Sequence, residues 1–380
     1  MQRISAFKAV CVYFIFASFG VEYGDKSMTY KISSLAALGW NTFFASQVHE
    51  DEQNITRPAK VVEVHRGQNR VVAPGLDTVV PSFKGELDGE ETAATVGDWI
   101  LLDAVTKAPV RLLDRNSLFK RRAPGTDRRF QLIAANIDTL FIVSSCNQDF
   151  NIARLERYLA LASEAGVMPI LVLTKADLAE DAQEYVRRGA KLLPGLMVEL
   201  VDARNSESVG RLADWCKAGQ AAALVGSSGV GKSTLVNTLT AGAQILTQDI
   251  REDDAKGRHT TTGRTFYQLP SGGWLLDTPG MRGLEVTDAS EGVGEIFADI
   301  VELASSCRFN DCAHDTEPGC AVQAAIKDGQ LNAKRLKRWQ KLAAEESHSS
   351  ATMAERHTRD RAFGKMVKKA LKDKKRFRGG

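Results

Sequence analysis

The sequence predicts an α/β protein whose central part is a parallel sheet covered by helices on both faces. Between residues 131 and 290, apolar runs of strand length alternate with amphipathic helical runs, and such alternation is typical of a parallel sheet. One of these runs leads directly into a glycine-rich phosphate-binding loop. Short strands precede this region and a Cys/His cluster follows it, so we expect a smaller domain on each side.

Composition and charge limit the class of protein. With 380 residues, 43% hydrophobic and 26% charged, the chain is long enough for roughly two or three globular domains, and general disorder is excluded. Six cysteines are too few for a disulfide scaffold, and no apolar run reaches the roughly 20 residues that span a bilayer. Residues 331–380 hold 16 Lys and Arg against 5 Asp and Glu, whereas residues 1–330 hold 34 against 42. Such a basic end favours binding of a polyanion.

Residues 1–57 precede the first predicted strands, and residues 1–27 within them have two interpretations. The uncharged stretch 9–21 follows two basic residues, as in a short signal peptide. Alternatively, translation starts at Met28 and the stretch is a mis-assigned extension, which we favour because the rest of the chain is typical of a cytosolic protein. Residues 34–48 predict a short helix that packs through Leu38, Trp40 and Phe44.

Residues 58–115 are expected to form a small β domain. Five strand-like segments, KVVEVHR, RVVAPG, TVVPSF, GDWILLD and VRLLD, follow one another at close spacing and are broken by Gly and Asn turns, a pattern typical of a barrel or sandwich. Five strands in about 60 residues suit an OB-type β barrel, a common binder of single-stranded nucleic acid, although a β domain without that role has the same composition. The basic segment 115–130 predicts a linker, either solvated or in contact with phosphates.

A phosphate-binding loop follows the apolar run AAALV. The segment GSSGVGKST fits the pattern G-x-x-x-x-G-K-[ST] and stands between a predicted strand and a predicted helix. Backbone N–H groups of such a loop surround phosphate oxygens, the lysine reaches the β- and γ-phosphates, and the serine after it binds Mg²⁺. The nucleotide-binding residues of the loop are Gly226, Ser227, Ser228, Gly229, Val230, Gly231, Lys232, Ser233 and Thr234.

A base-reading motif ends the apolar run MPILVL and consists of Thr174, Lys175, Ala176 and Asp177. A carboxylate at this position accepts from guanine N1–H and N2–H₂, a donor pair that adenine lacks, so guanine nucleotides are favoured. The lysine stem covers the plane of the base. The alternative role of Asp177 is that of a helix N-cap.

Two further segments are expected at the γ-phosphate. Asp277 and Gly280 belong to DTPG after the run GGWLL, where the aspartate holds a Mg²⁺-bound water and the glycine N–H meets the γ-phosphate. Between DTPG and the phosphate loop lies GRHTTTG, residues 257–263. We expect Thr261, with Thr262 as second choice, to complete the Mg²⁺ coordination in a segment that nucleotide orders.

The order of these motifs departs from that of ordinary GTPases. In those proteins the phosphate loop comes first and the base motif last, whereas here the base motif precedes the loop by about 50 residues. The same sheet can be built with its strands entered in a different order, so residues 116–290 predict a circularly permuted P-loop GTPase domain. Asp202, in the segment VDA, is a candidate for the second base-contacting loop.

Residues 291–346 are expected to form a helical zinc-binding domain. Its ligands, Cys307, Cys312, His314 and Cys320, have the spacing C-x₄-C-x-H-x₅-C, and four such N and S ligands match tetrahedral Zn²⁺. With four protein ligands no coordination position stays open, so the site is structural. Thiolate ligands also require a reducing compartment.

Together these features resemble the family of circularly permuted, ribosome-stimulated GTPases of small ribosomal subunit biogenesis. The resemblance spans about residues 35–343 and includes LGW…FF, the β domain, TKAD, GSSGVGKST, HTTT, DTPG and the cysteine cluster. It implies a GTP hydrolase that binds the small ribosomal subunit and its rRNA, assists late maturation and leaves after hydrolysis. It also implies one structural Zn²⁺ per chain, Mg²⁺ with GTP, and a cytoplasmic protein without membrane contact, which we expect to be a monomer.

The group that orients the attacking water is not the usual one. Met281 stands where Ras-like proteins have a glutamine, and a thioether cannot orient water, so slow intrinsic hydrolysis is expected. His259 is the nearest candidate, since imidazole hydrogen-bonds water and titrates near neutral pH. The resemblance supports a role for His259 in ribosome-stimulated turnover, while contact with RNA or solvent is the alternative. The expected catalytic group is therefore His259, Thr261, Asp277 and Gly280.

Two other functions stay open on the sequence alone. In a GTP-gated RNA-binding or chaperone module, nucleotide would set affinity and hydrolysis would be incidental, and subunit-stimulated turnover distinguishes it from the GTPase. A membrane-associated GTPase would use residues 9–21 as its anchor, and cell fractionation would reveal it.

The basic tail, residues 347–380, is expected to add rRNA affinity. Its last 20 residues hold nine Lys and Arg and a single acid, with few large apolar residues for a membrane-surface helix. Deleting 347–380 should weaken small-subunit binding and lower its salt dependence, because fewer counterions are released, while GTP affinity stays unchanged. Filter binding at a series of salt concentrations measures both quantities, and an unchanged salt slope would contradict the assignment.

Overall fold

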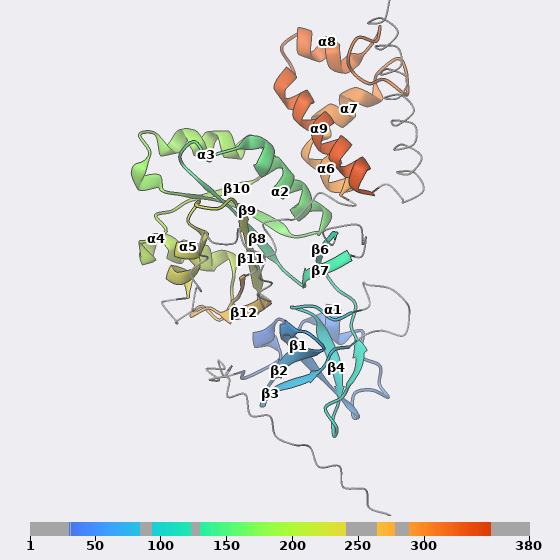
Figure 1. Ribbon diagram of the computed structural model, residues 1–380, viewed down its shortest axis with the longest axis vertical. Helices are drawn as coiled ribbons and strands as arrows, with labels where there is room; N and C mark the ends of the chain where they lie inside the picture. Colours follow the sequence, from blue (N-terminus) through green and yellow to red (C-terminus); the bar gives the residue numbers. More distant parts are fainter. Residues whose placement is uncertain are drawn as a thin grey trace, which may run out of the picture.

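Three parts of the chain lie along the long axis of the computed structural model (Figure 1). A small β domain occupies one end, an α/β domain the middle, and a group of helices the other end. The predictions for residues 1–27 and for most of the basic tail (residues 347–380) lie outside the described residues. Over the part that is described, no helix is long and apolar enough to cross a bilayer. The structure describes residues 30, 32–83, 93–122, 130–240, 264–277 and 289–350.

The N-terminal segment forms two short helices, η1 (Ala36–Leu38) and α1 (Thr42–Ala45). The side chain of Asn41 caps α1 by accepting from the backbone N–H groups of the second and third helical residues. Leu38 and Phe44 are buried, and Trp40 packs against the same core. The predicted packing of this segment is confirmed.

The small β domain consists of β1 (Thr56–His65), β2 (Gln68–Ala73), β3 (Leu76–Pro81), β4 (Trp99–Asp103) and β5 (Pro109–Leu112). Strand β1 is central, because it pairs antiparallel with both β2 and β4, while β3 pairs with β2 and β5 pairs with β4. The five strands therefore follow the antiparallel order β3-β2-β1-β4-β5, and the closure of this sheet into an OB-type barrel stays a prediction. The side chains of one face gather in a separate core of Ala59, Val61, Val71, Ala73, Val80, Ile100 and Leu102.

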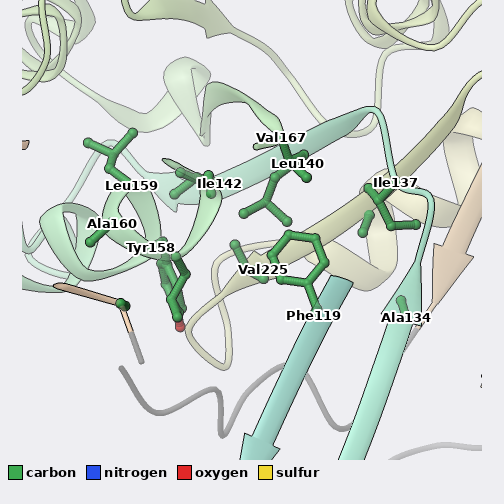
Figure 2. Close-up of a cluster of buried hydrophobic side chains, with 14 of the residues drawn as sticks. Phe119, Ala134, Ile137, Leu140, Ile142, Tyr158, Leu159, Ala160, Val167 and Val225 are labelled. Atoms are coloured by element: carbon green, nitrogen blue, oxygen red, sulfur yellow. The ribbon is translucent and has the colours of Figure 1, made fainter. Parts of the chain in front are cut away.

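The prediction that residues 115–130 form a linker is wrong, because β6 lies within this segment and β7 begins at its last residue. β6 (Leu118–Arg122) pairs antiparallel with β7 (Phe130–Ala135), and Figure 2 shows Phe119 in the same buried cluster as Leu140 and Val225. Arg115 does not face solvent phosphates either: its Nε donates to a fully buried carboxylate oxygen of Asp98 at 2.8 Å. The segment has too few apolar residues at alternate positions to indicate a strand, and its many basic residues favoured a solvated linker instead.

The middle of the molecule contains a sheet with the order β10-β9-β8-β11-β13-β12. The first five strands are parallel, and β12 is antiparallel to β13. Every residue of β8 and β11 is buried, as expected for parallel strands covered on both faces. The strands are β8 (Thr139–Ser145), β9 (Met168–Thr174), β10 (Met197–Leu200), β11 (Ala221–Gly226), β12 (Arg264–Gln268) and β13 (Trp274–Asp277).

Helices cover both faces of this sheet (Figure 1). On one face, Leu140 and Ile142 of β8 share a core with α2 (Ile152–Glu164) and α3 (Ala182–Ala190). On the opposite face, Phe141 and Val143 share a second core with α4 (Ser206–Gly210) and α5 (Lys232–Leu239). Successive side chains of a strand point to opposite faces, so a continuous apolar run supplies both cores. The predicted α/β architecture is confirmed.

The C-terminal helices are α6 (Ser290–Ile296), α7 (Ala298–Ser305), α8 (Ala321–Lys327) and α9 (Ala333–Ser350). Helix α6 packs closely against α2: a Cβ on Gly292 would lie 2.1 Å from the carbonyl oxygen of Ala160, so only glycine permits this approach. A buried carboxylate, Glu156 of α2, is 1% exposed and binds the guanidinium groups of Arg335 and Arg338 on α9. Both contacts join this helical part to the α/β domain.

The small β domain is joined to the sheet by strand pairing. β1 pairs with β12, with Glu63 opposite Thr265, so a single eleven-stranded sheet runs through both domains. The hydroxyl of Tyr30 donates to the carbonyl of Phe266 at 2.8 Å, and the indole N–H of Trp274 donates to the carbonyl of Ala37 at 2.8 Å. The sequence did not predict β12, and this joint therefore became visible only in the structure.

A buried lysine lies at the joint. Lys60 of β1 is 2% exposed, and its Nζ donates to the carbonyl of Leu38 at 2.7 Å between the rings of Trp99 and Phe266. Burial lowers its pKa to about 8, against the opposing influence of Asp138. The ring faces attract the ammonium, yet desolvation dominates because no carboxylate is in direct contact among the described residues.

We expect Lys60 to make stability depend on pH. Its native pKa lies below the ordinary value of 10.5, so the unfolded chain binds more protons between about pH 8 and pH 10.5, and stability rises with pH there. Between pH 7 and pH 9.5 the native chain should gain about 2 kcal/mol relative to Lys60→Met, which lacks the amine. Guanidinium denaturation of both proteins measures this difference, and parallel pH profiles would contradict it.

Candidate functional site

The candidate nucleotide site lies where the strand order of the sheet reverses. From β8 the chain continues to β9 on one side, whereas from β11 it reaches β13 on the other side. Ligands of open parallel sheets bind outside the carboxyl ends of the strands at such a point. The predicted phosphate loop follows β11 and the predicted base motif follows β9, so both reach the same edge.

The glycines of the phosphate loop are required by its backbone. Gly226 has φ +148°, and a Cβ there would lie 2.2 Å from the carbonyl oxygen of Val143 on the neighbouring strand. Gly231 has φ +94° and stands directly before α5, where left-handed backbone favours glycine. The chain therefore turns tightly and aims the first turn of α5 at the edge of the sheet.

Lys232 folds back over this loop. Its Nζ donates to the carbonyl of Gly226 at 2.8 Å and to the carbonyl of Ser227. Ser233 and Thr234 are exposed at the first turn of α5, and Ser228 and Gly229 are exposed at the tip of the loop. A cation, free hydroxyls and a helix N-terminus are thus brought together, as phosphate and Mg²⁺ binding requires.

Thr174 connects the base motif to the phosphate loop. Its fully buried hydroxyl lies 2.5 Å from the carbonyl oxygen of Val230 and 3.1 Å from that of Ser144. One hydroxyl has one proton, so it donates to these carbonyls alternately or shares the proton between them. The first residue of the base motif is therefore a structural contact between three loops, a role that its sequence pattern did not predict.

Asp177 does not act as a helix cap, and its contact with a base stays a prediction. It lies in the turn η3 (Ala176–Leu178), where its carboxylate is exposed and accepts no hydrogen bond from the part of the chain that the structure describes. Asp181 caps α3 instead, accepting from the N–H of Glu184 at 3.1 Å. Lys175, two residues before Asp177, adopts left-handed backbone with φ 57°. The capping alternative for Asp177 is therefore wrong.

The segment containing Asp202 lies at the same edge. It follows β10, whose neighbour is β9, and the carboxylate of Asp202 accepts from the N–H of Arg204 at 2.9 Å. The hydroxyl of Thr238 on α5 donates to the carbonyl of Ala203 at 2.7 Å. This loop is consequently tied to the helix of the phosphate loop, and its contact with a base stays a prediction.

The other predicted catalytic residues are placed only in part. Asp277 is the last residue of β13, paired with Thr265, on a strand next to β11. That position is the one expected of it at the carboxyl edge. The remaining members, His259, Thr261, Thr262, Gly280 and Met281, lie outside the described residues.

One cation at this edge was not predicted. Arg154, the third residue of α2, donates from its guanidinium to the hydroxyl of Ser227 in the phosphate loop. The available signal was a basic residue in the first turn of the helix after an apolar strand. Such residues are common on solvated helix faces, so spacing alone did not distinguish it.

The predicted metal ligands converge. The ligand atoms of Cys307, Cys312, His314 and Cys320 all lie within 4.8 Å of one another. Nδ1 of His314 is 3.6 Å from Sγ of Cys307 and 3.5 Å from Sγ of Cys320. Three sulfurs and one imidazole nitrogen at such separations fit the donor set of a structural tetrahedral metal site.

Surrounding groups hold these ligands in place. His314 has φ 58°, and its carbonyl accepts from the side-chain amide of Gln323 at 2.6 Å. The sulfur of Cys320 accepts from the backbone N–H of Gln323 at 3.4 Å at the start of α8, which fixes the position of the sulfur. The imidazole ring lies 5.6 Å from the ring of Trp339 on α9. A bound metal ion would therefore link the loop after α7 to the start of α8, with Trp339 of α9 packed against its histidine ligand.

Comparison with known proteins agrees with this arrangement. A family model described as RsgA GTPase matches residues 112–287. The Small ribosomal subunit biogenesis GTPase RsgA 2 of Vibrio parahaemolyticus is 48% identical over 342 residues, which cover 90% of this chain and 94% of that protein. The Small ribosomal subunit biogenesis GTPase RsgA of Mesorhizobium japonicum is 48% identical over 328 residues, covering 86% and 93%.

Two solved structures share the fold. YjeQ from Thermotoga maritima has a TM-score of 0.57 at 24% identity and covers 77% of this chain and 98% of its own. YloQ, described as a circularly permuted GTPase, has a TM-score of 0.55 at 24% identity, with coverage of 80% and 99%. The predicted circular permutation is confirmed by this likeness and by the strand order.

We expect the contact between the two motif loops to be needed for both stability and nucleotide binding. Thr174→Val keeps the shape of the side chain but removes the hydroxyl, which should cost about 1–3 kcal/mol of unfolding free energy and weaken GDP binding. Thr174→Ser keeps the hydroxyl and serves as the matched control, with a smaller loss. Chemical denaturation and nucleotide titration measure the two effects, and equal behaviour of Val and Ser variants would show that the hydroxyl is unimportant.

Proposed function

Because this chain belongs to the RsgA family of GTPases, we propose that it hydrolyses GTP while bound to the small ribosomal subunit and thereby assists the late maturation of that subunit. The chain is a GTP hydrolase by membership of the family. Its substrates are GTP and water, and its products are GDP and phosphate. In the proposed cycle GTP favours the bound form, and hydrolysis allows release.

The observation that carries this function is the meeting of two loops at one sheet edge. A guanine-reading carboxylate, Asp177, and a phosphate-binding loop are held together by the hydroxyl of Thr174. The distance between base and phosphate subsites is thereby fixed by the protein, which favours a guanine nucleotide over other phosphates. Lys232 and the N–H groups of the loop neutralise negative charge on the β- and γ-phosphates.

Hydrolysis needs an external group or a rearrangement because Met281 cannot orient water. We assign this task to His259, with Thr261 and Ser233 on the Mg²⁺ that accompanies GTP and with Asp277 and Gly280 at the γ-phosphate. Subunit binding would then complete the site by positioning His259. This assignment accounts for slow turnover of the protein alone.

The metal of the cysteine cluster is proposed to be Zn²⁺. Cys307, Cys312, His314 and Cys320 supply four ligands, so the ion has a structural role, crosslinking the loop after α7 to the start of α8. Thiolate ligands are stable in a reducing compartment, and we propose a cytoplasmic location. The barrel, the zinc-binding helices and the basic tail would provide contacts to rRNA, made by one monomer on each subunit.

Phosphate release in the presence of purified small subunits tests the proposal. We expect stimulation well above about twofold over the protein alone, and large subunits serve as the control for nonspecific RNA. His259→Ala should keep its affinity for GTP and lose most of the stimulated rate. Stimulation below about twofold would favour a GTP-gated binding module, and an unchanged stimulated rate in His259→Ala would remove that residue from the mechanism.

A further inference from the structure

Arg154 provides a second cation at the phosphate loop. It is exposed in the first turn of α2 and donates to the hydroxyl of Ser227, the residue after the first glycine of the loop. Lys232 donates to the carbonyl of this same Ser227. Two cationic side chains from different elements therefore converge on one loop residue.

That convergence brings Arg154 to the loop residue that Lys232 also contacts. The lysine of a phosphate loop reaches the β- and γ-phosphates, so a guanidinium anchored on the same residue as Lys232 lies close to the γ-phosphate position. An arginine in this setting binds phosphate oxygens through two parallel N–H donors, a geometry that lysine lacks.

The carboxylates of the described residues leave Arg154 without an ion pair. Within the described segments, no acidic side chain lies within ion-pair distance of Arg154, whereas Arg157 in the same helix binds Glu345 and Arg187 binds Asp181 and Glu184. The positive charges of Arg154 and Lys232, which both contact Ser227, repel each other. An anion bound between them relieves that repulsion. The arrangement is therefore complementary to a highly charged anion.

Helix α2 holds Arg154 in position. Leu155 and Leu159 are buried under the helix, and the cap residue Asn151 accepts from the N–H of Arg154 at 3.1 Å. On another side Glu156 binds Arg335 and Arg338 of α9. Because packing and ion pairs fix the helix, little entropy is lost when its exposed guanidinium binds a ligand.

We propose that Arg154 binds the γ-phosphate of GTP and so makes the site prefer GTP over GDP. This inference rests on the nucleotide site used in the proposed function and adds a specificity-determining residue to it. It also gives α2 a contact with the nucleotide at one end and with the zinc-binding helices along its side. Loss of the γ-phosphate would release one contact of this helix.

The test compares Arg154→Gln with the native full-length chain in titrations with a non-hydrolysable GTP analogue and with GDP, both with Mg²⁺ and without ribosomal subunits. The analogue should bind about tenfold more weakly to the variant, as expected for loss of a charge-assisted hydrogen bond. GDP affinity should change less than about twofold. Arg187→Gln removes one positive charge from the surface of the same domain and should leave both affinities unchanged.

Two further variants distinguish ligand binding from loop support. Ser227→Ala removes the anchor of Arg154 but keeps its charge, and Arg154→Lys keeps charge without the two parallel donors, so both should fall between native and Arg154→Gln for the analogue. Equal weakening of analogue and GDP in Arg154→Gln would show a loop-supporting role and overturn the proposal, as would unchanged affinities. Because no subunits are present, such failure leaves the subunit-stimulated function untouched.

Discussion

The nucleotide site depends on one buried hydroxyl. Thr174 ends β9, and its Oγ1 lies within hydrogen-bond distance of carbonyls at the end of β8 and in the phosphate loop after β11. A buried polar group without a partner is costly, so this contact is satisfied only when the three loops have their native separation. The separation of the loops that carry TKAD and GSSGVGKST follows from that constraint.

Helix α2 extends the same constraint to the rest of the molecule. It packs on the sheet through one face, approaches α6 at Gly292, and binds two arginines of α9 through Glu156. Truncating either side of a buried ion pair leaves an uncompensated charge, so the C-terminal helices cannot shift freely against α2. A change in contacts at the first turn of this helix would therefore be felt in a domain that holds no nucleotide residue.

The joint with the barrel is built on different chemistry. Strand pairing between β1 and β12 and the buried amine of Lys60 connect the two domains, and β12 directly precedes the strand that ends in Asp277. Ladder hydrogen bonds are directional and fix register. The small β domain is thus attached to the strand pair β12–β13, while the C-terminal helices are attached through α2.

The sequence by itself determined the chemistry of this protein and the order of its parts. Phosphate loop, base motif and metal ligands are local patterns, because each needs a few residue types at short spacing, and the continuous apolar runs of β8, β9 and β11 identify buried parallel strands. Segment 115–130 was misjudged and β12 was missed, because short edge and hairpin strands draw their stability from partners distant in the chain. Only the tertiary structure decided that Thr174 connects the base motif to the phosphate loop, that Arg154 contacts Ser227 and that Lys60 is buried. Each of these depends on contacts between elements that sequence spacing does not encode.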